Sequence, residues 1–360
     1  MLKIGIVGLA QSGKTTLFEI LTRAHGSAAG AGRPEARVGV VRVPDRRLDR
    51  LAEMYHPKKT VYASVEYVDT SGSIIEIARA GAQMAALREM DALAHVVGAF
   101  GGDASAPEAS LAGARAAIES VELELMLSDL AVIEKRVERL EKDLKKIRNP
   151  VLEKEFQALQ VAKTTLEKQT PLREVPLGAG EEKTLRGFTF LSMKPMLYVL
   201  NLGEKDAARL GAAEEFQALA GFASRPRTEV TAVCGRIEAE LAQLDEQDAA
   251  EFLSSYGLKE SAIARLIRSS YHLLGLISFF TVGEDECRAW TIRSGRTALE
   301  AAGEIHSDLA KGFIRAEVVK YDDLVSSGGL PEARTRGVLK LEGKEYVVQD
   351  GEIVHIRHSG

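Results

Sequence analysis

A glycine-rich stretch near the start of the chain carries residue types that bind phosphate. Residues 8–16 read Gly-Leu-Ala-Gln-Ser-Gly-Lys-Thr-Thr and complete the pattern G-x-x-x-x-G-K-[ST]. Gly8 and Gly13 let the backbone wrap an anion with its N–H groups pointing inward. Lys14 supplies a positive charge for the β- and γ-phosphates, and the Thr15 hydroxyl is a hard oxygen ligand for Mg²⁺. The expected phosphate-binding residues are Gly8, Ala10, Gln11, Ser12, Gly13, Lys14, Thr15 and Thr16.

The elements on either side of this stretch are those that a P-loop requires. Residues 2–7 form an apolar run rich in Ile and Val, which predicts a buried strand. Leu17, Phe18, Ile20 and Leu21 share one face of a helix, whose first turn adds unpaired N–H groups and the positive end of its dipole. The alternative is a strand–turn–helix with chance glycines, which arises in on the order of a few per cent of chains this long.

A second motif is placed to read Mg²⁺ and the γ-phosphate. Residues 69–72, Asp-Thr-Ser-Gly, follow a β-branched run at 61–68 and match the D-x-x-G of P-loop GTPases. There the Asp holds Mg²⁺ through water and the Gly N–H meets the γ-phosphate. We therefore expect Asp69 to join Thr15 at the metal, and Gly72 to join Lys14 in catalysis.

The base side of the site is predicted after two later strands. Asn201-Leu202-Gly203-Glu204 follows the apolar run 196–200 and stands in the place of the guanine-reading N-K-x-D. Leu202 replaces the Lys that packs on the base, and Glu204 replaces Asp, so strict GTP selectivity should weaken. The alternative for Asn201 and Glu204 is an Asn turn and an exposed acid. The remaining base-side loop is expected at Val233-Cys234-Gly235-Arg236.

Length and composition narrow the class of protein. A chain of 360 residues can form two or three domains with real cores. The formal net charge of −5 excludes a global attraction to nucleic acid or anionic membranes. The two cysteines, Cys234 and Cys287, lack metal-ligand spacing, and no apolar run reaches membrane-spanning length. We expect a cytoplasmic protein.

Strand-length runs alternate with helical patterns, which predicts a doubly wound α/β sheet with ligands at the carboxyl ends of its strands. The strands are expected at 38–43, 61–68, 92–100, 196–200 and 230–233, and the helices at 44–57, 237–244, 249–258 and 262–276. The small-residue tract 26–32 is predicted to be a loop.

A helical insertion interrupts this alternation after a linker at 101–110. Apolar residues step in a heptad pattern that breaks at Asn149-Pro150 and resumes, which predicts an antiparallel hairpin. The first series is Ile133, Val137, Leu140, Leu144, Ile147 and Val151, and the second is Leu152, Phe156, Leu159 and Leu166. The many charges at 134–148 are expected to form a solvated face, with a basic strip for RNA or a partner as the alternative.

The last stretch has short strands with Gly turns, at 278–281, 289–292, 314–319, 338–341, 345–348 and 353–356, and one helix at 298–310. These predict a compact α+β module of about eighty residues.

The chain resembles the YchF subfamily of Obg-like P-loop ATPases/GTPases over nearly its whole length. The matching segments include residues 8–18, 38–41, 43–45, 47–48, 194–201, 233–234 and 237–240, and, in the last module, 288–291, 312–318 and 346–351. The resemblance implies a Ras-like G domain (1–108 and 178–277), a coiled-coil insertion (109–177) and a TGS domain (278–360). It further implies an ATPase that prefers ATP or accepts both nucleotides, and ribosome or RNA association at a groove flanked by the three parts.

The chain also departs from the family pattern. Residues 33–37, Arg-Pro-Glu-Ala-Arg, replace a switch I segment whose Thr senses Mg²⁺ and the γ-phosphate. Gln11 stands in place of an Asn linked to potassium activation, and switch II is shortened to 73–81. Losing γ-phosphate sensing and water positioning could each cost orders of magnitude in rate. These departures suggest a divergent paralogue.

Three functions are therefore weighed. The first is a slow Mg²⁺-dependent nucleoside triphosphatase that acts as a translation- or stress-linked switch. The second is a nucleotide-binding scaffold without useful turnover, whose hairpin and TGS domain bind partners. The third is primarily an RNA- or ribosome-binding module, which the net acidity of the chain disfavours.

Overall fold

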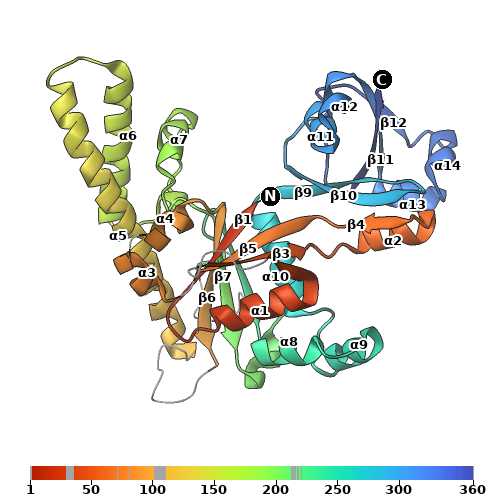
Figure 1. Ribbon diagram of the computed structural model, residues 1–360, viewed down its shortest axis with the longest axis horizontal. Helices are drawn as coiled ribbons and strands as arrows, with labels where there is room; N and C mark the ends of the chain where they lie inside the picture. Colours follow the sequence, from red (N-terminus) through yellow and green to blue (C-terminus); the bar gives the residue numbers. More distant parts are fainter. Residues whose placement is uncertain are drawn as a thin grey trace. The chain divides into compact units, whose positions relative to one another are not determined.

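The computed structural model (Figure 1) describes residues 2–29, 36–70, 72–80, 82–100, 111–211, 216, 219 and 221–359. The chain forms two compact units. One unit contains Met1–Val41 and Glu66–Leu273, and the other contains Arg42–Val65 and Leu274–Gly360. Among the described residues, no helix combines the length and apolarity needed to cross a membrane.

A seven-stranded sheet of described residues forms the centre of the first unit, in the order β2-β3-β5-β1-β6-β7-β8. Its strands are β1 (Lys3–Val7), β2 (Gly26–Ala29), β3 (Ala36–Arg42), β5 (Ser64–Thr70), β6 (Ala92–Ala99), β7 (Met196–Leu202) and β8 (Thr228–Val233). The strands from β5 through β8 in this order are parallel, and β2 pairs antiparallel with β3. The carboxyl ends of β1, β5, β6, β7 and β8 therefore meet at one edge, as predicted.

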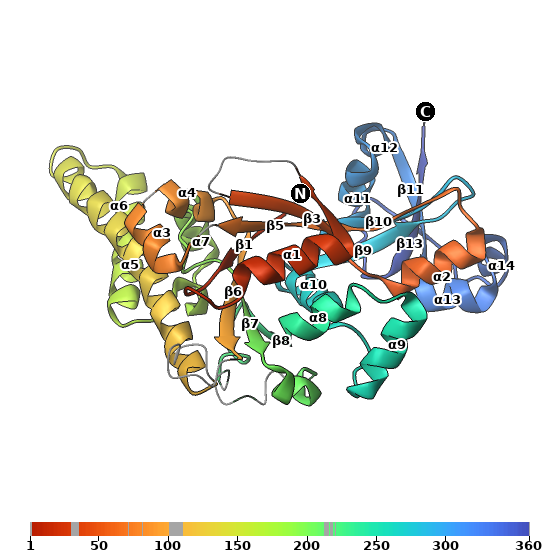
Figure 2. The same cartoon turned by 60° about the horizontal axis from the view of Figure 1, so that its bottom comes forward.

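Helices cover both faces of this sheet (Figures 1 and 2). They are α1 (Lys14–His25), α3 (Ile74–Ala80), α4 (Ala82–Arg88), α8 (Gly235–Leu241), α9 (Glu246–Ser255) and α10 (Ala262–Leu273), with 3-10 turns η2 (Leu172–Glu174), η3 (Arg186–Phe188) and η4 (Glu204–Arg209). The apolar core includes Leu93, Leu200, Phe216 and Ile237, all almost fully buried. Burial of both sheet faces explains why the central strands are continuous apolar runs.

Two local predictions for this part of the chain are wrong. The tract 26–32 was expected to be a loop, but residues 26–29 form β2, which pairs with Val38–Val41; residues 30–32 lie outside the described residues. The run 61–68 was expected to be one strand, but it contributes to two. Residues 59–61 form β4 (Lys59–Val61), which pairs with a strand of the second unit, and β5 starts at Ser64.

The helical insertion is an antiparallel pair, α5 (Leu111–Leu144) and α6 (Pro150–Glu167), joined by a short turn and followed by α7 (Ala179–Leu185). Asn149 caps α6, because its Oδ1 accepts from the N–H of Val151 at 2.9 Å. Ile133, Leu140 and Leu159 are buried between the helices, as the heptad pattern predicted. The predicted linker 101–110 lies outside the described residues.

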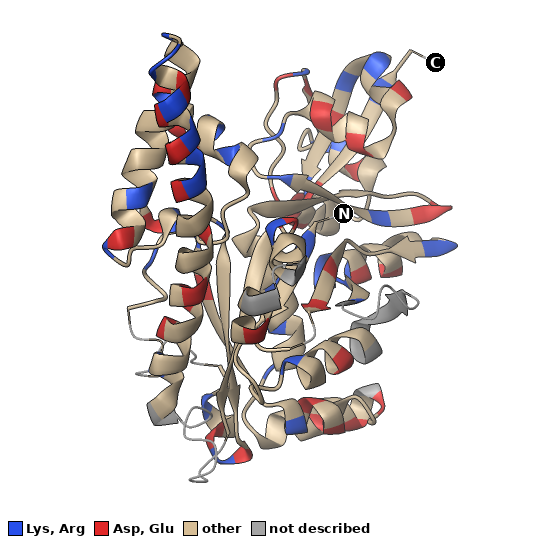
Figure 3. Ribbon diagram, turned by 60° about the vertical axis from the view of Figure 1, so that its left-hand side comes forward, with Lys and Arg blue, Asp and Glu red and all other residues tan. Residues whose placement is uncertain are grey.

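The predicted heptad does not continue to the end of the hairpin. Ile147 and Val151 are 67% and 72% exposed. The reason is geometric: α5 ends at Leu144, so residue 147 lies in the turn and no longer shares the buried face. The charged residues at 134–148 are mostly exposed, and both signs mix along the hairpin (Figure 3), which agrees with a solvated face.

The second unit is built on a six-stranded mixed sheet of described residues, in the order β12-β11-β13-β9-β10-β4. Its further strands are β9 (Leu276–Thr281), β10 (Glu286–Arg293), β11 (Phe313–Lys320), β12 (Lys340–Glu342) and β13 (Glu352–His358). Its helices are α2 (Arg46–Tyr55), α11 (Ala298–Ile305), α12 (Ser307–Lys311), α13 (Tyr321–Ser327) and α14 (Leu330–Thr335). Leu48 and Leu51 are fully buried on α2, as predicted.

This unit differs from the sequence prediction in four ways. Residues 42–65 belong to it, although the sequence had placed them in the first domain. The helix predicted at 298–310 divides at His306, whose extended backbone ends α11 and starts α12. Residues 345–348 form no regular strand; there is only an isolated bridge between Thr297 and Val347. The helices α13 and α14 were not predicted.

Candidate nucleotide-binding site

The loop after β1 has the backbone that its glycines allow. Gly8 has a φ of 154°, and a Cβ there would lie 2.5 Å from the carbonyl oxygen of Val96. Gly13 has a φ of 93°, and a Cβ there would lie 2.3 Å from Nδ2 of Asn201. Both positions are therefore closed to side chains. The loop turns between β1 and α1, as the phosphate-binding motif predicted.

Lys14 is the first residue of α1 and is almost buried, at 8% exposure. Its Nζ donates to the carbonyl oxygen of Leu9 at 2.6 Å, so the ammonium group lies against the backbone of the loop. Burial lowers the pKa of Lys14, while the charges of Asp69 and Glu76 oppose that shift. A positive charge held inside the loop is the feature that a phosphate group requires there.

Thr15 and Asp69 meet at the side of the loop where Mg²⁺ was expected. Thr15 Oγ1 lies 3.5 Å from Asp69 Oδ2, and Asp69 is 2% exposed at the end of β5. Its other oxygen, Oδ1, has no hydrogen-bond partner among the described residues. Hydroxyl and carboxylate oxygens suit Mg²⁺, so the two residues fit this ion. Among the described residues, no group of three or more His, Cys, Asp or Glu is arranged to hold a metal.

Arg37 also reaches this place, which the sequence analysis did not predict. Its Nη2 donates to Asp69 Oδ2 at 2.6 Å and its Nη1 to Glu19 Oε1 at 3.2 Å. The guanidinium carbon lies 5.0 Å from the ring centre of Phe18. The sequence offered one clue: a long cationic side chain at the start of β3, which is the neighbour of β5, the strand that contains Asp69.

Gly72 lies two residues before the start of α3, with a φ of 100° and an exposed position. Glu76 caps this helix: its Oε2 accepts from the N–H of Ser73 at 2.7 Å, and its own N–H donates to Ser73 Oγ at 3.3 Å. A Cβ on Gly72 would lie 3.1 Å from Glu76 Oε2. The Glu76 carboxylate therefore lies beside Gly72, the residue expected to meet the γ-phosphate, and this neighbour was not predicted from the sequence.

On the base side, the structure brings Asn201, the P-loop and Gly235 together. Nδ2 of Asn201 donates to the carbonyl oxygen of Ser12 at 3.2 Å, and its Oδ1 accepts from the N–H of Gly235 at 3.3 Å. Glu204 is paired with Arg236, whose Nε lies 3.1 Å from Glu204 Oε1. This arginine is the last residue of the predicted base-side loop, and its ion pair with Glu204 was not predicted.

Leu202, Val233 and Cys234 were expected to contact the base, but their side chains are buried. Each is at most 2% exposed, because β7 and β8 run through or up to these positions and turn them into the core. Burial raises the pKa of the Cys234 thiol. Any contact from these residues to a base would therefore come from the backbone.

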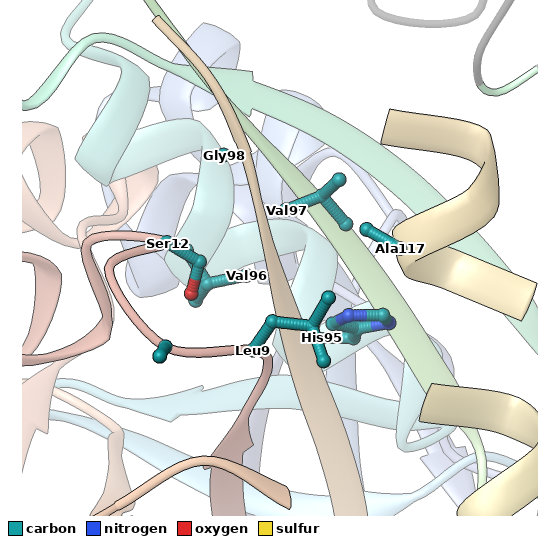
Figure 4. Close-up of a pocket in the computed structure, with 8 residues that line it drawn as sticks. Leu9, Ser12, His95, Val96, Val97, Gly98 and Ala117 are labelled. Atoms are coloured by element: carbon teal, nitrogen blue, oxygen red, sulfur yellow. The ribbon is translucent and has the colours of Figure 1, made fainter. Parts of the chain in front are cut away.

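A small cavity lies beneath the loop, lined by Leu9, Ser12, His95, Val97 and Ala117 among others (Figure 4). Its volume of about 10 Å³ matches one water molecule and excludes a nucleotide. Neither ring nitrogen of His95 nor Ser12 Oγ has a partner among the described residues. Burial lowers the pKa of His95 to about 4, so its ring is neutral at pH 7.

A buried polar network lies behind His95 and includes residues from α5 and β7. Glu122 and Arg173 form an ion pair, and the hydroxyl of Tyr198 donates to Glu122 Oε1 at 2.5 Å. Burial opposes the charge on Glu122, but the Arg173 guanidinium and these hydrogen bonds hold the pKa of Glu122 below its usual value. The network therefore fixes the base of α5 to the sheet beneath the P-loop.

Three features define a P-loop nucleotide-binding protein of the G-domain class. They are a phosphate-binding loop between a parallel strand and a helix, an Asp at the end of the adjacent strand, and an Asn beside the loop. Comparison with known proteins makes the assignment more specific. The chain belongs to the YchF family, as its sequence predicted. Residues 276–359 match a family model for the C-terminal part of YchF GTPases, described as a protein of unknown function (DUF933).

The similar proteins cover the chain almost completely. "Ribosome-binding ATPase YchF" of Bacillus subtilis is 40% identical over 365 residues, covering 99% of each chain. The protein of the same name in Escherichia coli O157:H7 is 36% identical and covers 98% of each. The chain also matches the structure of the Schizosaccharomyces pombe YchF GTPase with a TM-score of 0.83 and 28% sequence identity. This match covers 99% of the chain and 97% of the Schizosaccharomyces pombe chain. The predicted fold class, a P-loop G domain with a helical insertion and a C-terminal α+β module, is confirmed.

Proposed function

We propose that this protein binds a purine nucleoside triphosphate with Mg²⁺ at the loop after β1 and hydrolyses it slowly, as a ribosome-linked switch in the cytoplasm. The observation that carries the proposal is the convergence of Lys14, Thr15, Asp69 and Asn201 at one edge of the sheet. Lys14 and Thr15 belong to the phosphate loop, Asp69 to the D-x-x-G motif and Asn201 to the base-side motif, and their convergence supports binding of one nucleotide by all three. The names of the relatives, ribosome-binding ATPases, support the same function.

Each residue of the site has a distinct proposed role. Backbone N–H groups of residues 8 and 10–16 receive the phosphates, and the Lys14 ammonium moves from Leu9 to the β- and γ-oxygens. Thr15 and Asp69 hold Mg²⁺, which neutralises charge on the phosphates when bound. The N–H of Gly72 meets the γ-phosphate.

On the base side, we propose that ATP binds at least as well as GTP. An Asp in the place of Glu204 would accept from both N–H donors of guanine, but Glu204 is longer and already pairs with Arg236. Without those two charged hydrogen bonds, guanine has no large advantage over adenine. The affinities for ATP and GTP should therefore lie within about tenfold of each other.

Phosphate release by the purified protein, compared with Lys14→Ala, tests the proposal. We expect slow ATP and GTP turnover that the substitution abolishes, since Lys14 is the positive charge inside the loop. Calorimetry with ATP, GTP and their diphosphates gives the base preference in the same samples. Phosphate release that does not depend on Lys14, or is absent, would leave only nucleotide binding.

That outcome would favour a second function, a nucleotide-binding scaffold. The observation in its favour is that Arg37, rather than a switch I Thr, contacts Asp69, and that Ser73 is engaged with Glu76. Co-sedimentation with ribosomes over a series of salt concentrations tests the partner in both cases. A switch should show binding that changes with nucleotide, whereas an RNA-binding module would bind equally without it.

A further inference from the structure

Arg37 is held in place by three contacts on the metal side of the loop. Beyond its bonds to Asp69 and Glu19, its guanidinium lies over the ring of Phe18 on α1. Its backbone is part of β3, which is adjacent to β5 in the sheet. The side chain is 45% exposed, so it can leave the site by rotation without unfolding the sheet.

Arg37 binds the Asp69 oxygen that lies nearer to Thr15, the other residue expected at the metal. Oδ2 of Asp69 accepts from Arg37 at 2.6 Å and is also the oxygen that faces Thr15 Oγ1. Asp69 is 3% exposed in its side chain, so the carboxylate has little other access to solvent. A guanidinium 2.6 Å from this oxygen repels a divalent cation at the same place, so Arg37 and Mg²⁺ compete for Asp69.

The charges near the loop explain why a cation rests here. Asp69, Glu19 and Glu76 are acidic, and Lys14 is the other cation beside them. Without Arg37, the carboxylate of Asp69 would be buried beside an anionic phosphate ligand, which is unfavourable. The guanidinium removes that repulsion before any metal arrives.

We propose that Arg37 is an internal counter-cation at the magnesium position: it neutralises Asp69 while no metal is bound, and Mg²⁺ that enters with nucleotide must displace it. The proposal rests on nucleotide binding at this loop. Two consequences follow. In the absence of Mg²⁺, the wild-type protein should bind nucleotide more tightly than a protein without Arg37, in which the Asp69 carboxylate is not neutralised. Adding Mg²⁺ should then increase the nucleotide affinity less in the wild-type protein than in the protein without Arg37.

The ratio of the nucleotide dissociation constant in EDTA to that in saturating Mg²⁺ measures both consequences at once. Calorimetry with ADP and with ATP gives this ratio for wild type and Arg37→Ala in the full chain. The substitution should raise the ratio by on the order of fivefold, the size expected for a half-exposed ion pair. Arg42→Ala is the matched control, because Arg42 is an exposed arginine at the other end of β3.

Each outcome decides the proposal. An unchanged or smaller ratio in Arg37→Ala would overturn it, and the contact with Asp69 would then be a structural tie between neighbouring strands. Arg37→Gln, which keeps a hydrogen-bond donor but no charge, should also raise the ratio and serves if Arg37→Ala fails to fold in a thermal melt. If wild type binds neither nucleotide under either condition, nucleotide binding itself is refuted; tight binding with an unchanged ratio refutes the role of Arg37 alone.

Discussion

The side-chain amide of Asn201 donates a hydrogen bond to the carbonyl oxygen of Ser12, across 3.2 Å. Its other end accepts from Gly235, so one side chain at the end of β7 connects the loops that follow β1 and β8. The parallel register makes this possible, because Asn201 pairs with Gly98 on one side and Val233 on the other. Asn201 therefore supports the shape of the phosphate loop from the base side.

Removal of this support should weaken nucleotide binding. Asn201→Ala deletes two hydrogen bonds of about 1 kcal/mol each, and we expect the nucleotide dissociation constant to rise at least about tenfold. Calorimetry measures this change. Asn149→Ala, which removes the cap of α6, is the control and should leave the affinity unchanged. Equal affinities for wild type and Asn201→Ala would show that the loop holds its shape without the amide.

His95 should make the protein less stable in mild acid. In the unfolded chain its pKa is about 6.5, whereas burial lowers it to about 4 in the folded protein. The unfolded state therefore binds more protons as the pH falls below about 6.5, and the free energy of unfolding should drop by about 2 kcal/mol between pH 7 and pH 5 from this group. Urea denaturation at the two pH values measures it.

The matching variant is His95→Leu, which has no charge to gain and should lose most of that pH dependence. His355→Gln, at an exposed position on β13, should keep it. Glu122 does not account for this change. Because its pKa is lowered in the folded protein, its contribution to the free energy of unfolding is lost at more acidic pH than the range from pH 7 to pH 5. A pH dependence that survives in His95→Leu would assign the effect to another group.

Asp129 should be among the most sensitive positions of the insertion. Its fully buried carboxylate accepts from Arg88 Nη1 at 2.7 Å, from the backbone N–H groups of Leu191 and Ser192 at 3.0 and 2.7 Å, and from Ser192 Oγ at 2.8 Å. Asp129→Ala leaves these donors buried without their acceptor and should lower the free energy of unfolding by about 3–5 kcal/mol.

Denaturant unfolding monitored by circular dichroism gives this value. Glu119→Ala, on the same helix, removes an exposed i,i+4 pair with Arg115 and should cost less than about 0.5 kcal/mol. A loss below about 1 kcal/mol in Asp129→Ala would mean that water replaces the carboxylate.

The end of the hairpin should tolerate polar substitution, although its sequence continues the heptad. Ile147→Ser removes a side chain that is already 67% exposed, so we expect a change within about 0.5 kcal/mol. Leu140→Ala removes a fully buried side chain and should cost about 2–5 kcal/mol. Thermal melts of both variants make the comparison. A similar loss in the two would show that residue 147 packs on the hairpin after all.

The sequence predicted the phosphate loop, the parallel sheet and the hairpin because each is specified by neighbouring residues. The motif at residues 8–16 needs glycine, lysine and threonine at fixed positions, and strand and helix periods recur over many residues. The heptad prediction failed near Ile147 because the apolar spacing continues past Leu144, where α5 ends.

Other features depend on pairings between distant segments. β4 is three residues long, too short for a periodic signal, and its place beside β10 moves residues 42–65 into the second unit. Leu202 reads as a base-side residue but is buried because β7 extends further than its apolar run. Arg37 and Asp69 are 32 residues apart, and only the sheet order makes them neighbours.

The amino-acid sequence by itself therefore determined the family, the class of fold and the residue types that hold phosphate, since these are local properties of the chain. Tertiary structure decided which side chains share that place: the ammonium of Lys14 on Leu9, the amide of Asn201 on Ser12 and the guanidinium of Arg37 on Asp69. The physical reason is that strand pairing sets the distances between residues far apart in sequence, and charge interactions depend on those distances.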